Sequence, residues 1–122
     1  MLIALLVIGG AIGAPARYLV DGFVQNRSRG VFPWGTFVIN MTGSLILGFL
    51  TGLTMYHGLG TLPKVAIGTG FCGAYTTFST FSYETLRLLE EGAVLAASLN
   101  AAVSVMVGLA AAAVGLALAA AF

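Results

Sequence analysis

Long apolar runs alternate along the chain with short polar or helix-breaking segments. The runs begin near residues 2, 34, 63 and 93 and end near residues 20, 56, 83 and 122. The segments after the first three runs contain Gly30 and Pro33, then HGLGTLPK, then the charged stretch YETLRLLEEG. A membrane-crossing helix needs about 20 mostly apolar residues. The pattern predicts an all-α membrane protein with four transmembrane helices in a single domain that covers residues 1–122.

The composition indicates the same environment. Hydrophobic residues make up 59% of the chain and charged residues only 7%, whereas about 25% of residues are charged in typical soluble domains. We therefore expect a multi-pass protein of the cell (inner) membrane. Four helices leave no room for a soluble catalytic domain, and no motif indicates a nucleophile with a base or a phosphate-binding loop. We expect neither an enzyme nor a nucleic-acid-binding protein.

The first run has some features of a secretory signal peptide. Its apolar part leads to small residues around Ala14 and Ala16. It lacks the positively charged segment that normally precedes the apolar part of a signal peptide. We expect the run to be retained as the first transmembrane helix.

Glycines recur at four-residue spacing in two of the runs. Gly9 pairs with Gly13, and Gly48 pairs with Gly52. Such small-xxx-small patterns let helix backbones approach closely in a membrane. The spacing predicts tightly packed helices with only narrow passages between them.

The basic residues give a weak orientation signal. With four helices, the first and third loops share a side with Arg17, Arg27, Arg29 and Arg87, whereas Lys64 and the amino terminus lie on the other side. Arg17 and Arg87 fall near helix ends, where they count less toward orientation. Single and mixed orientations both stay open.

The segment GFCGAYTTFSTFSYE at 70–84 combines glycines, hydroxyl groups and phenylalanines within an otherwise apolar chain, which makes it the strongest candidate for a functional site. Helical spacing places these residues on one face: Thr76, Ser79, Thr80, Tyr83 and Glu84. Phe78 and Phe81 form an adjoining stripe. A polar stripe beside an aromatic one indicates the wall of a narrow polar path. The alternative is that the hydroxyls bond back to carbonyls one turn earlier and the rings fill core space.

Glycines also occupy positions 68, 70 and 73, just before Tyr75 and Thr76. Glycine weakens helix continuity and can leave backbone carbonyls without an intrahelical partner. Unpaired carbonyls are costly inside a membrane unless they bind a cation or line a wet cavity. The glycines indicate either a buried monovalent cation or simple close packing.

Other polar residues lie inside the runs and need partners. Asn40 lies one turn from Ser44, and Asn100, Ser104 and Gly108 repeat this spacing in the fourth run. An asparagine in a transmembrane helix either joins helices or faces a polar path. Both interpretations stay open for these two stripes.

Two ionisable residues lie deeper in the runs than the others. Arg17 lies near the end of the first run, where its long side chain can reach the lipid headgroups. We expect this structural role for the arginine. Glu84 precedes the charged end of the third run and lies deeper than Arg87, Glu90 and Glu91.

Three segments together resemble the CrcB/Fluc family of fluoride channels: GGAIGAPARY at 9–18, PWGTFVINMTGSLILGF at 33–49 and GFCGAYTTFSTFSYE at 70–84. The resemblance covers essentially the whole chain and is most specific in TTFSTF. It implies a fluoride-selective channel that exports fluoride passively and lowers cytoplasmic fluoride. It also implies an antiparallel, dual-topology homodimer with two fluoride pathways, a third helix broken near its middle, and a structural sodium ion at the centre of the interface.

The resemblance also implies roles for individual residues. Backbone carbonyls of Gly73 and Thr76, contributed by both subunits, would hold the sodium ion. The residues that match the fluoride pathway are Asn40, Phe78, Ser79, Thr80, Phe81 and Ser104. Arg17 matches the arginine of the first-helix motif. Some family members have a tyrosine where Asn100 stands and a serine where Gly108 stands, so the chain departs from the family pattern there.

Two other classes fit the size of the chain. A small dual-topology multidrug exporter would be coupled to protons through an acidic residue within the first helix, and residues 1–20 contain no acidic residue. A membrane scaffold that transports nothing fits the composition equally well. A flux measurement separates the channel from both.

Overall fold

Three long helices dominate the computed structural model, which describes residues 1–30 and 32–122. They are α1 (Leu2–Arg27), α2 (Trp34–His57) and α6 (Val94–Ala120), and each is long and apolar enough to cross a membrane. Four shorter elements lie between α2 and α6: α3 (Thr61–Pro63), the π-helix η1 (Lys64–Cys72), α4 (Gly73–Tyr75) and α5 (Phe78–Glu90). All elements of the described residues are helical, so the predicted all-α class is confirmed.

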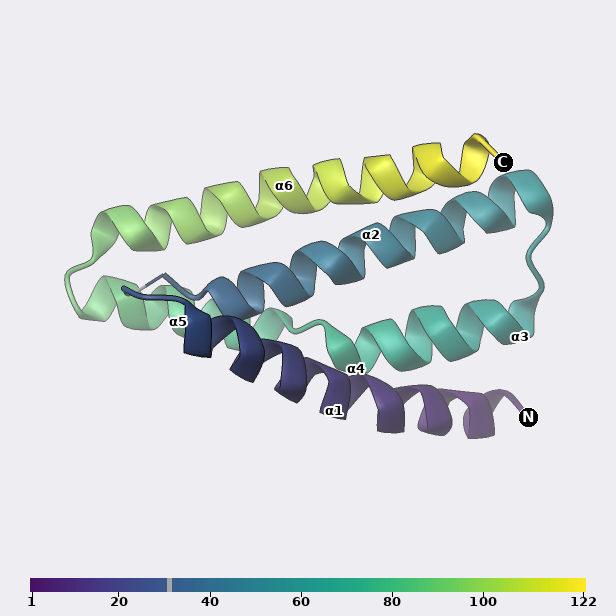
Figure 1. Cartoon of the computed structure of the whole chain (residues 1–122), viewed down its shortest axis with the longest axis horizontal. Coiled ribbons are helices and arrows are strands. Elements are labelled where there is room, and N and C mark those ends of the chain that lie inside the picture. The colour runs from purple at the N-terminus through teal and green to yellow at the C-terminus, as the bar shows by residue number, and fades with distance from the viewer. Residues whose placement is uncertain (31) are drawn as a thin grey trace.

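The helices run roughly side by side along the long axis of the molecule (Figure 1). Helices α2 and α6 pack against each other over most of their length, and α1 packs mainly against η1 and α4. The short helix α5 contacts α6 and, more sparsely, α2. The two chain termini lie at one end of the molecule, and the loop between α5 and α6 lies at the other (Figure 1).

Helix α1 is longer than the apolar run that predicts it. The run ends near residue 20, but the helix continues to Arg27 and includes Arg17 and Asp21. The last turns are stabilised by side chains, since Arg27 donates a hydrogen bond to Phe23 O (3.3 Å) and its guanidinium lies 3.7 Å from the centre of the Phe23 ring. These contacts explain why α1 can extend beyond its apolar run into a segment that carries charged residues.

Both predicted glycine pairs form close helix contacts. All four glycines are buried, each against another helix: Gly9, Gly13, Gly48 and Gly52. A β-carbon on Gly9 would overlap the backbone oxygen of Ala66 in η1, and one on Gly48 would overlap that of Ala112 in α6. The prediction of close packing is confirmed for the pairs α1–η1 and α2–α6.

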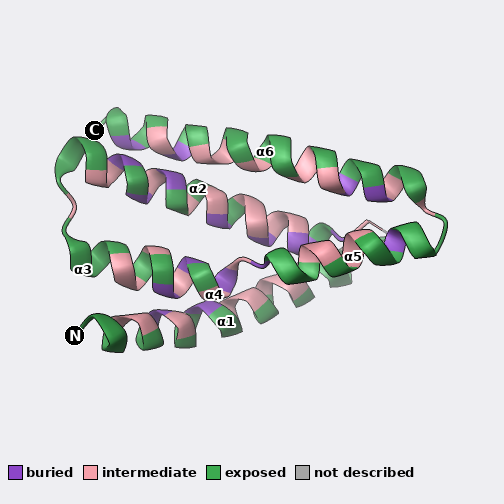
Figure 2. Ribbon diagram, turned by 180° about the vertical axis from the view of Figure 1, so that it is seen from behind, coloured by how far each residue is buried: buried purple, intermediate pink, exposed green. Residues whose placement is uncertain are grey.

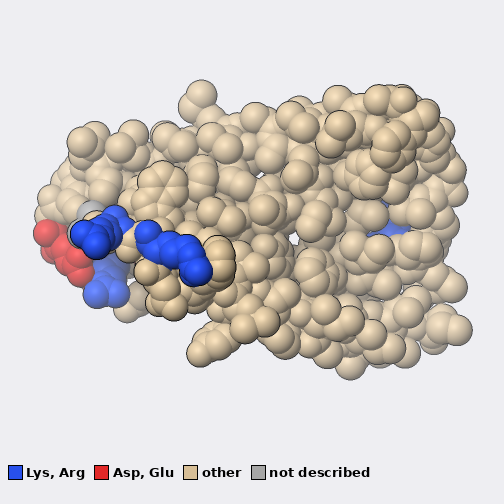
Figure 3. Space-filling model, in the orientation of Figure 1, with Lys and Arg blue, Asp and Glu red and all other residues tan. Residues whose placement is uncertain are grey.

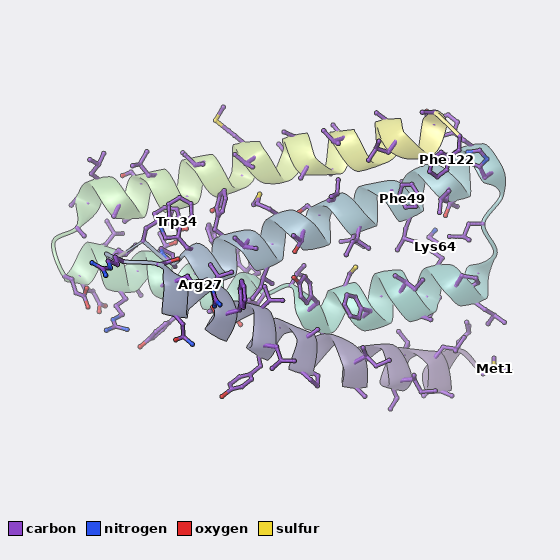
Figure 4. The ribbon with its side chains drawn as sticks, in the orientation of Figure 1. Met1, Arg27, Trp34, Phe49, Lys64 and Phe122 are labelled. Atoms are coloured by element: carbon purple, nitrogen blue, oxygen red, sulfur yellow. The ribbon has the colours of Figure 1, made fainter. Side chains whose placement is uncertain are left out.

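Charged residues collect at one end of the molecule (Figure 3). Arg27 and Trp34 lie near this end, whereas Met1 and Lys64 lie near the other (Figure 4). Arg87 forms an exposed ion pair with Glu91 on α5, with 3.0 Å between Nε and Oε1. The charged end therefore brings the residues near the end of α1 together with those around α5.

Large apolar side chains cover the outside of the helices. Exposed residues lie along every long helix (Figure 2); examples are Ile3 at 76% exposure, Leu95 at 73% and Leu109 at 69%. Among the described residues, few hydrophobic side chains are buried: Ile39, Leu50, Cys72, Tyr75, Leu88, Ala97 and Ala119. Monomeric soluble proteins rarely expose apolar patches this extensive, so the surface is that of a multi-pass membrane protein.

Candidate functional site

Two extended residues separate α4 from α5. Helix α4 ends at Tyr75, and Thr76 (φ −79°, ψ 161°) and Thr77 (φ −151°, ψ 115°) have the dihedral angles of extended chain. Helix α5 begins at Phe78, with Thr77 as its N-cap, because the Thr77 Oγ1 accepts a hydrogen bond from the Thr80 N–H (3.1 Å). Threonine is a favoured N-cap residue for this reason. We call Thr76 and Thr77 the extended pair.

Asn40 of α2 binds the extended pair through both ends of its amide. Its Nδ2 donates to the backbone oxygen of Thr77 (3.2 Å), and its Oδ1 accepts from the backbone N–H of Thr77 (3.0 Å). An amide nitrogen carries two N–H groups. One donor of Asn40 therefore stays available for a further acceptor beside the extended pair.

The hydroxyls of the 70–84 segment divide between local and tertiary bonds. Thr76 donates to the oxygen of Cys72 (2.8 Å), which is the bond one turn earlier that the alternative interpretation expects. Tyr75 is buried, shares a hydrogen bond with Thr42 of α2 (2.8 Å) and stacks on Phe71 with 5.4 Å between ring centres. Thr77 instead caps α5. The segment is therefore neither a simple polar stripe nor simply a self-bonded helix.

An open cavity of about 250 Å³ lies beside the extended pair. We call it the asparagine cavity, and its lining residues are Asn40, Ser44, Leu47, Thr76, Thr77, Phe78 and Phe81. The rings of Phe78 and Phe81 lie 6.1 Å apart at an interplanar angle of 41°. Phe78 is 80% exposed in the single chain. This cavity brings together three of the predicted pathway residues, Asn40, Phe78 and Phe81.

A second cavity, of about 150 Å³, lies between α1, α2 and α5. We call it the arginine cavity, and its lining residues are Ala14, Arg17, Tyr18, Asp21, Thr36, Ile39, Thr77 and Thr80. It contains the predicted pathway residue Thr80. It also contains Arg17, for which sequence analysis expects only contact with headgroups. Thr77 lines both cavities, so the extended pair lies between them.

Ser79 and Ser104 lie apart from both sets of lining residues. Ser79 is exposed, with its Oγ 3.4 Å from that of Thr77. Ser104 of α6 donates to Oδ1 of Asn100 (3.4 Å), and the buried Asn100 donates to the hydroxyl of Thr85 in α5 (2.7 Å). In the single chain, Asn100 therefore joins α6 to α5, and Ser104 bonds within α6.

A further tertiary bond joins α5 to α2. The hydroxyl of the buried Thr36 donates to Oε1 of Glu84 (2.5 Å). Thr36 is not among the residues predicted from the sequence, although its spacing gives a signal for it. Thr36, Asn40 and Ser44 follow one another at four-residue spacing and so share one face of α2. The stripe that faces the site is one turn longer than the predicted pair of Asn40 and Ser44.

Comparisons with known proteins identify the family. Residues 4–116 match the family described as "CrcB-like protein, Camphor Resistance (CrcB)". The chain is 56% identical to "Fluoride-specific ion channel FluC 1" of Streptomyces avermitilis over 112 residues, which are 91% of this chain and 90% of the relative. It is 53% identical to the protein of the same name from Frankia casuarinae over 123 residues, which cover 94% of this chain and 93% of the relative. The chain belongs to the CrcB family.

Proposed function

We propose that the chain forms a fluoride-selective channel that exports fluoride passively across the cell membrane and lowers cytoplasmic fluoride. The relatives at 56% and 53% identity are named fluoride-specific ion channels, and they align over nearly their full length. The observation that carries the proposal is the asparagine cavity, where Asn40 lies with Phe78 and Phe81. These are residues that the family resemblance assigns to the fluoride pathway.

The chemistry of the asparagine cavity suits a small, strongly hydrated anion. Fluoride needs closely placed donors to replace the water that it loses in a narrow path. The second N–H of Asn40 is one such donor, and the positive edges of the Phe78 and Phe81 rings add favourable electrostatics. Donors held by the surrounding structure, rather than by mobile water, favour the ion that fits the constriction.

The arginine cavity extends the proposed pathway on the other side of the extended pair. Thr80 offers a hydroxyl there, and Arg17 contributes a positive charge that attracts an anion into the membrane. Ser79 and Ser104 belong to the proposed pathway through the family resemblance. In the single chain Ser79 is exposed and Ser104 bonds to Asn100, so their contribution requires the neighbouring subunit.

We propose that residues 61–90 make the third of four membrane crossings. Elements α3, η1, α4 and α5 follow one another along the long axis (Figure 1), and the extended pair interrupts them near the middle. Backbone outside a helix is tolerated at membrane depth where it is buried in protein or lines a wet cavity. The two cavities beside Thr77 satisfy this condition.

We further propose that the channel is an antiparallel, dual-topology homodimer. The asparagine cavity is open in the single chain, and the ring of Phe78 is largely exposed. A second copy that covers this face would close the path on the side that one chain leaves open. The small number of basic residues, five in the chain, suits insertion in both orientations.

The proposed dimer includes a structural sodium ion held by the backbone oxygens of Gly73 and Thr76 from both subunits. Uncharged oxygen ligands suit a hard monovalent cation. Gly73 is exposed, and no described residue outside its own stretch of backbone lies within 4 Å of the place where a side chain would begin. When bound, the ion supplies a positive potential that favours an anion nearby.

Halide efflux from liposomes tests the proposed function. Vesicles that contain the purified full-length protein are loaded with equal concentrations of potassium fluoride and potassium chloride, and each anion is followed with a selective electrode after valinomycin is added. We expect rapid fluoride efflux with chloride retained. Equal efflux of both anions, or of neither, would contradict the channel and favour a non-selective pore or a scaffold.

A further inference from the structure

We propose that Asn40 and Thr77 are positioning residues for a cation bound by the carbonyl oxygens of Gly73 and Thr76. Their side chains bind the N–H groups of Thr77 and Thr80, which in a continuous helix would donate to these two carbonyls. The inference deepens the proposed function, because it rests on a cation at these two carbonyls. It assigns the side chains of Asn40 and Thr77 to the cation site as well as to the anion pathway.

The hydrogen-bond pattern of an α-helix shows which N–H groups would bind these two carbonyls. Each N–H in a helix donates to the carbonyl four residues earlier. If α4 continued into α5 without interruption, the N–H of Thr77 would bind the oxygen of Gly73, and the N–H of Thr80 would bind the oxygen of Thr76. These two N–H groups decide whether the two carbonyls are free.

In the structure, side chains bind both of these N–H groups. The Thr77 N–H donates to Oδ1 of Asn40 (3.0 Å), and the Thr80 N–H donates to Oγ1 of Thr77 (3.1 Å). The N–H of Thr76, which is the next nearest donor for Gly73, donates to the oxygen of Cys72 (2.9 Å). The helical donors of both proposed cation ligands are therefore occupied elsewhere.

The hydrogen bond from the Thr77 N–H to Asn40 and the one from the Thr80 N–H to Thr77 both depend on the backbone conformation of Thr77. Asn40 holds both the N–H and the oxygen of this residue, which keeps Thr77 in the extended conformation (φ −151°, ψ 115°) that an N-cap requires. The capping hydroxyl of Thr77 then reaches the N–H of Thr80. One asparagine on α2 thus supports both free carbonyls.

This arrangement also connects the proposed anion and cation sites. Asn40 lines the asparagine cavity together with Phe78 and Phe81, and the same amide binds the residue that follows Thr76. A substitution of Asn40 that removes the acceptor of the Thr77 N–H should therefore weaken cation binding as well as fluoride conduction. A residue that served only as an anion ligand would leave the cation response intact.

The test measures the sodium response of the purified full-length protein in detergent. The unfolding midpoint is followed as sodium chloride replaces N-methylglucamine chloride at constant ionic strength, which gives the sodium concentration for half of the stabilisation. Thr77→Val keeps the side-chain shape but removes the hydroxyl that binds the Thr80 N–H. We expect this concentration to rise roughly 10- to 100-fold, as is typical when a group that orients a metal ligand is lost.

Two variants control for the change of shape. Thr77→Ser restores the capping hydroxyl and should respond to sodium like the wild type. Thr51→Val makes the same substitution at an exposed position of α2, where the hydroxyl donates only to Leu47 O of its own helix (2.8 Å). It should also respond like the wild type. A wild-type response of Thr77→Val would overturn the inference, and so would a wild-type protein that does not respond to sodium.

A pair of substitutions at Asn40 keeps the inference testable if Thr77→Val does not fold. Asn40→Asp retains an oxygen for the Thr77 N–H, whereas Asn40→Leu removes it. We expect the sodium response to survive in the aspartate variant and to be lost in the leucine variant. Equal responses of the two variants would contradict the inference.

Fluoride efflux from liposomes, measured on the same samples, separates this inference from the proposed function. No fluoride efflux from the wild type, together with a sodium response that Thr77→Val removes, would refute the channel and leave the inference standing. If fluoride efflux is selective but Thr77→Val leaves the sodium response unchanged, the positioning role is refuted and the proposed channel stands.

Discussion

The glycine-packed helix pairs and the extended pair differ in how their backbone hydrogen bonds are made. Along α1–η1 and α2–α6, small residues let backbones touch, and the helices satisfy their own hydrogen bonds. At Thr76 and Thr77 the helical pattern stops, and side chains of Asn40 and Thr77 bind backbone N–H groups instead. Packing in the first region depends on the absence of side chains, whereas the second region depends on particular side chains.

We therefore expect substitutions in the first region to change mainly the stability of the fold, and those in the second region to change mainly conduction. Substitutions in the glycine contacts should disturb the fold, because backbone cannot move away from an added side chain. Substitutions around the extended pair should leave the fold largely intact and change what the site binds. Four predictions test this separation.

The largest effect is expected in the glycine contacts. Gly48→Leu adds a β-carbon that overlaps the backbone oxygen of Ala112 in α6, and overpacking of this kind costs about 1–3 kcal/mol or more. We expect little or no monodisperse protein in size-exclusion chromatography. Gly22→Leu is the matched control, because no described residue outside the adjoining backbone of α1 lies within 4 Å of a β-carbon there. If both variants are equally well folded, the glycine contacts do not hold α2 against α6.

The next effect concerns the aromatic pair of the asparagine cavity. Phe78→Ile or Phe81→Ile removes one positive ring edge, worth up to about 1.5 kcal/mol. We expect fluoride efflux to fall roughly tenfold or more, while the elution volume and unfolding midpoint stay close to the wild-type values. Phe49→Ile, whose ring packs against Phe122 at 5.7 Å between centres, is the control. Unchanged efflux in the Phe78 and Phe81 variants would remove the aromatic-edge mechanism.

A smaller effect is expected from Asn40→Asp. The carboxylate keeps an acceptor for the Thr77 N–H but places negative charge where an anion must pass. Fluoride efflux should fall roughly tenfold, which corresponds to about 1.4 kcal/mol, and the protein should stay folded. Efflux at the wild-type rate would show that Asn40 serves only in packing.

The smallest effect is expected from Thr76→Ser. The proposed cation ligand is the backbone oxygen, and the side-chain hydroxyl donates to Cys72 O (2.8 Å), a bond that serine also makes. Because the hydroxyl is retained, the sodium concentration for half of the stabilisation should change by less than about twofold, which corresponds to about 0.4 kcal/mol. Loss of the sodium response would indicate that the side chain, and not the carbonyl, binds the ion.

The two regions also differ in how far the sequence predicts them. The contacts of Gly9, Gly13, Gly48 and Gly52 follow from spacing alone, because four-residue repeats place small residues on one helix face. The long apolar runs likewise predict α1, α2 and α6. The extra turns of α1 to Arg27 could not be predicted from the apolar run, because side chains such as Arg27 and Ser28 stabilise them through hydrogen bonds to the helix backbone.

The extended pair depends on contacts between residues far apart in sequence. The motif TTFSTF and Asn40 can each be recognised, but the bonds that link Asn40 to Thr77 join residues 37 positions apart. The bond between Thr36 and Glu84 spans 48 positions. Sequence spacing also does not reveal that Thr76 bonds to its own helix while its neighbour Thr77 caps the next one. These assignments require the tertiary structure.

An experimental structure of the purified protein in sodium fluoride would show where the anion binds. We expect an anion within hydrogen-bond distance of Asn40 Nδ2, with ring edges of Phe78 and Phe81 turned toward it. A fluoride ion bound elsewhere, with the Asn40 amide and both rings facing lipid or packed without an ion, would contradict the proposed pathway.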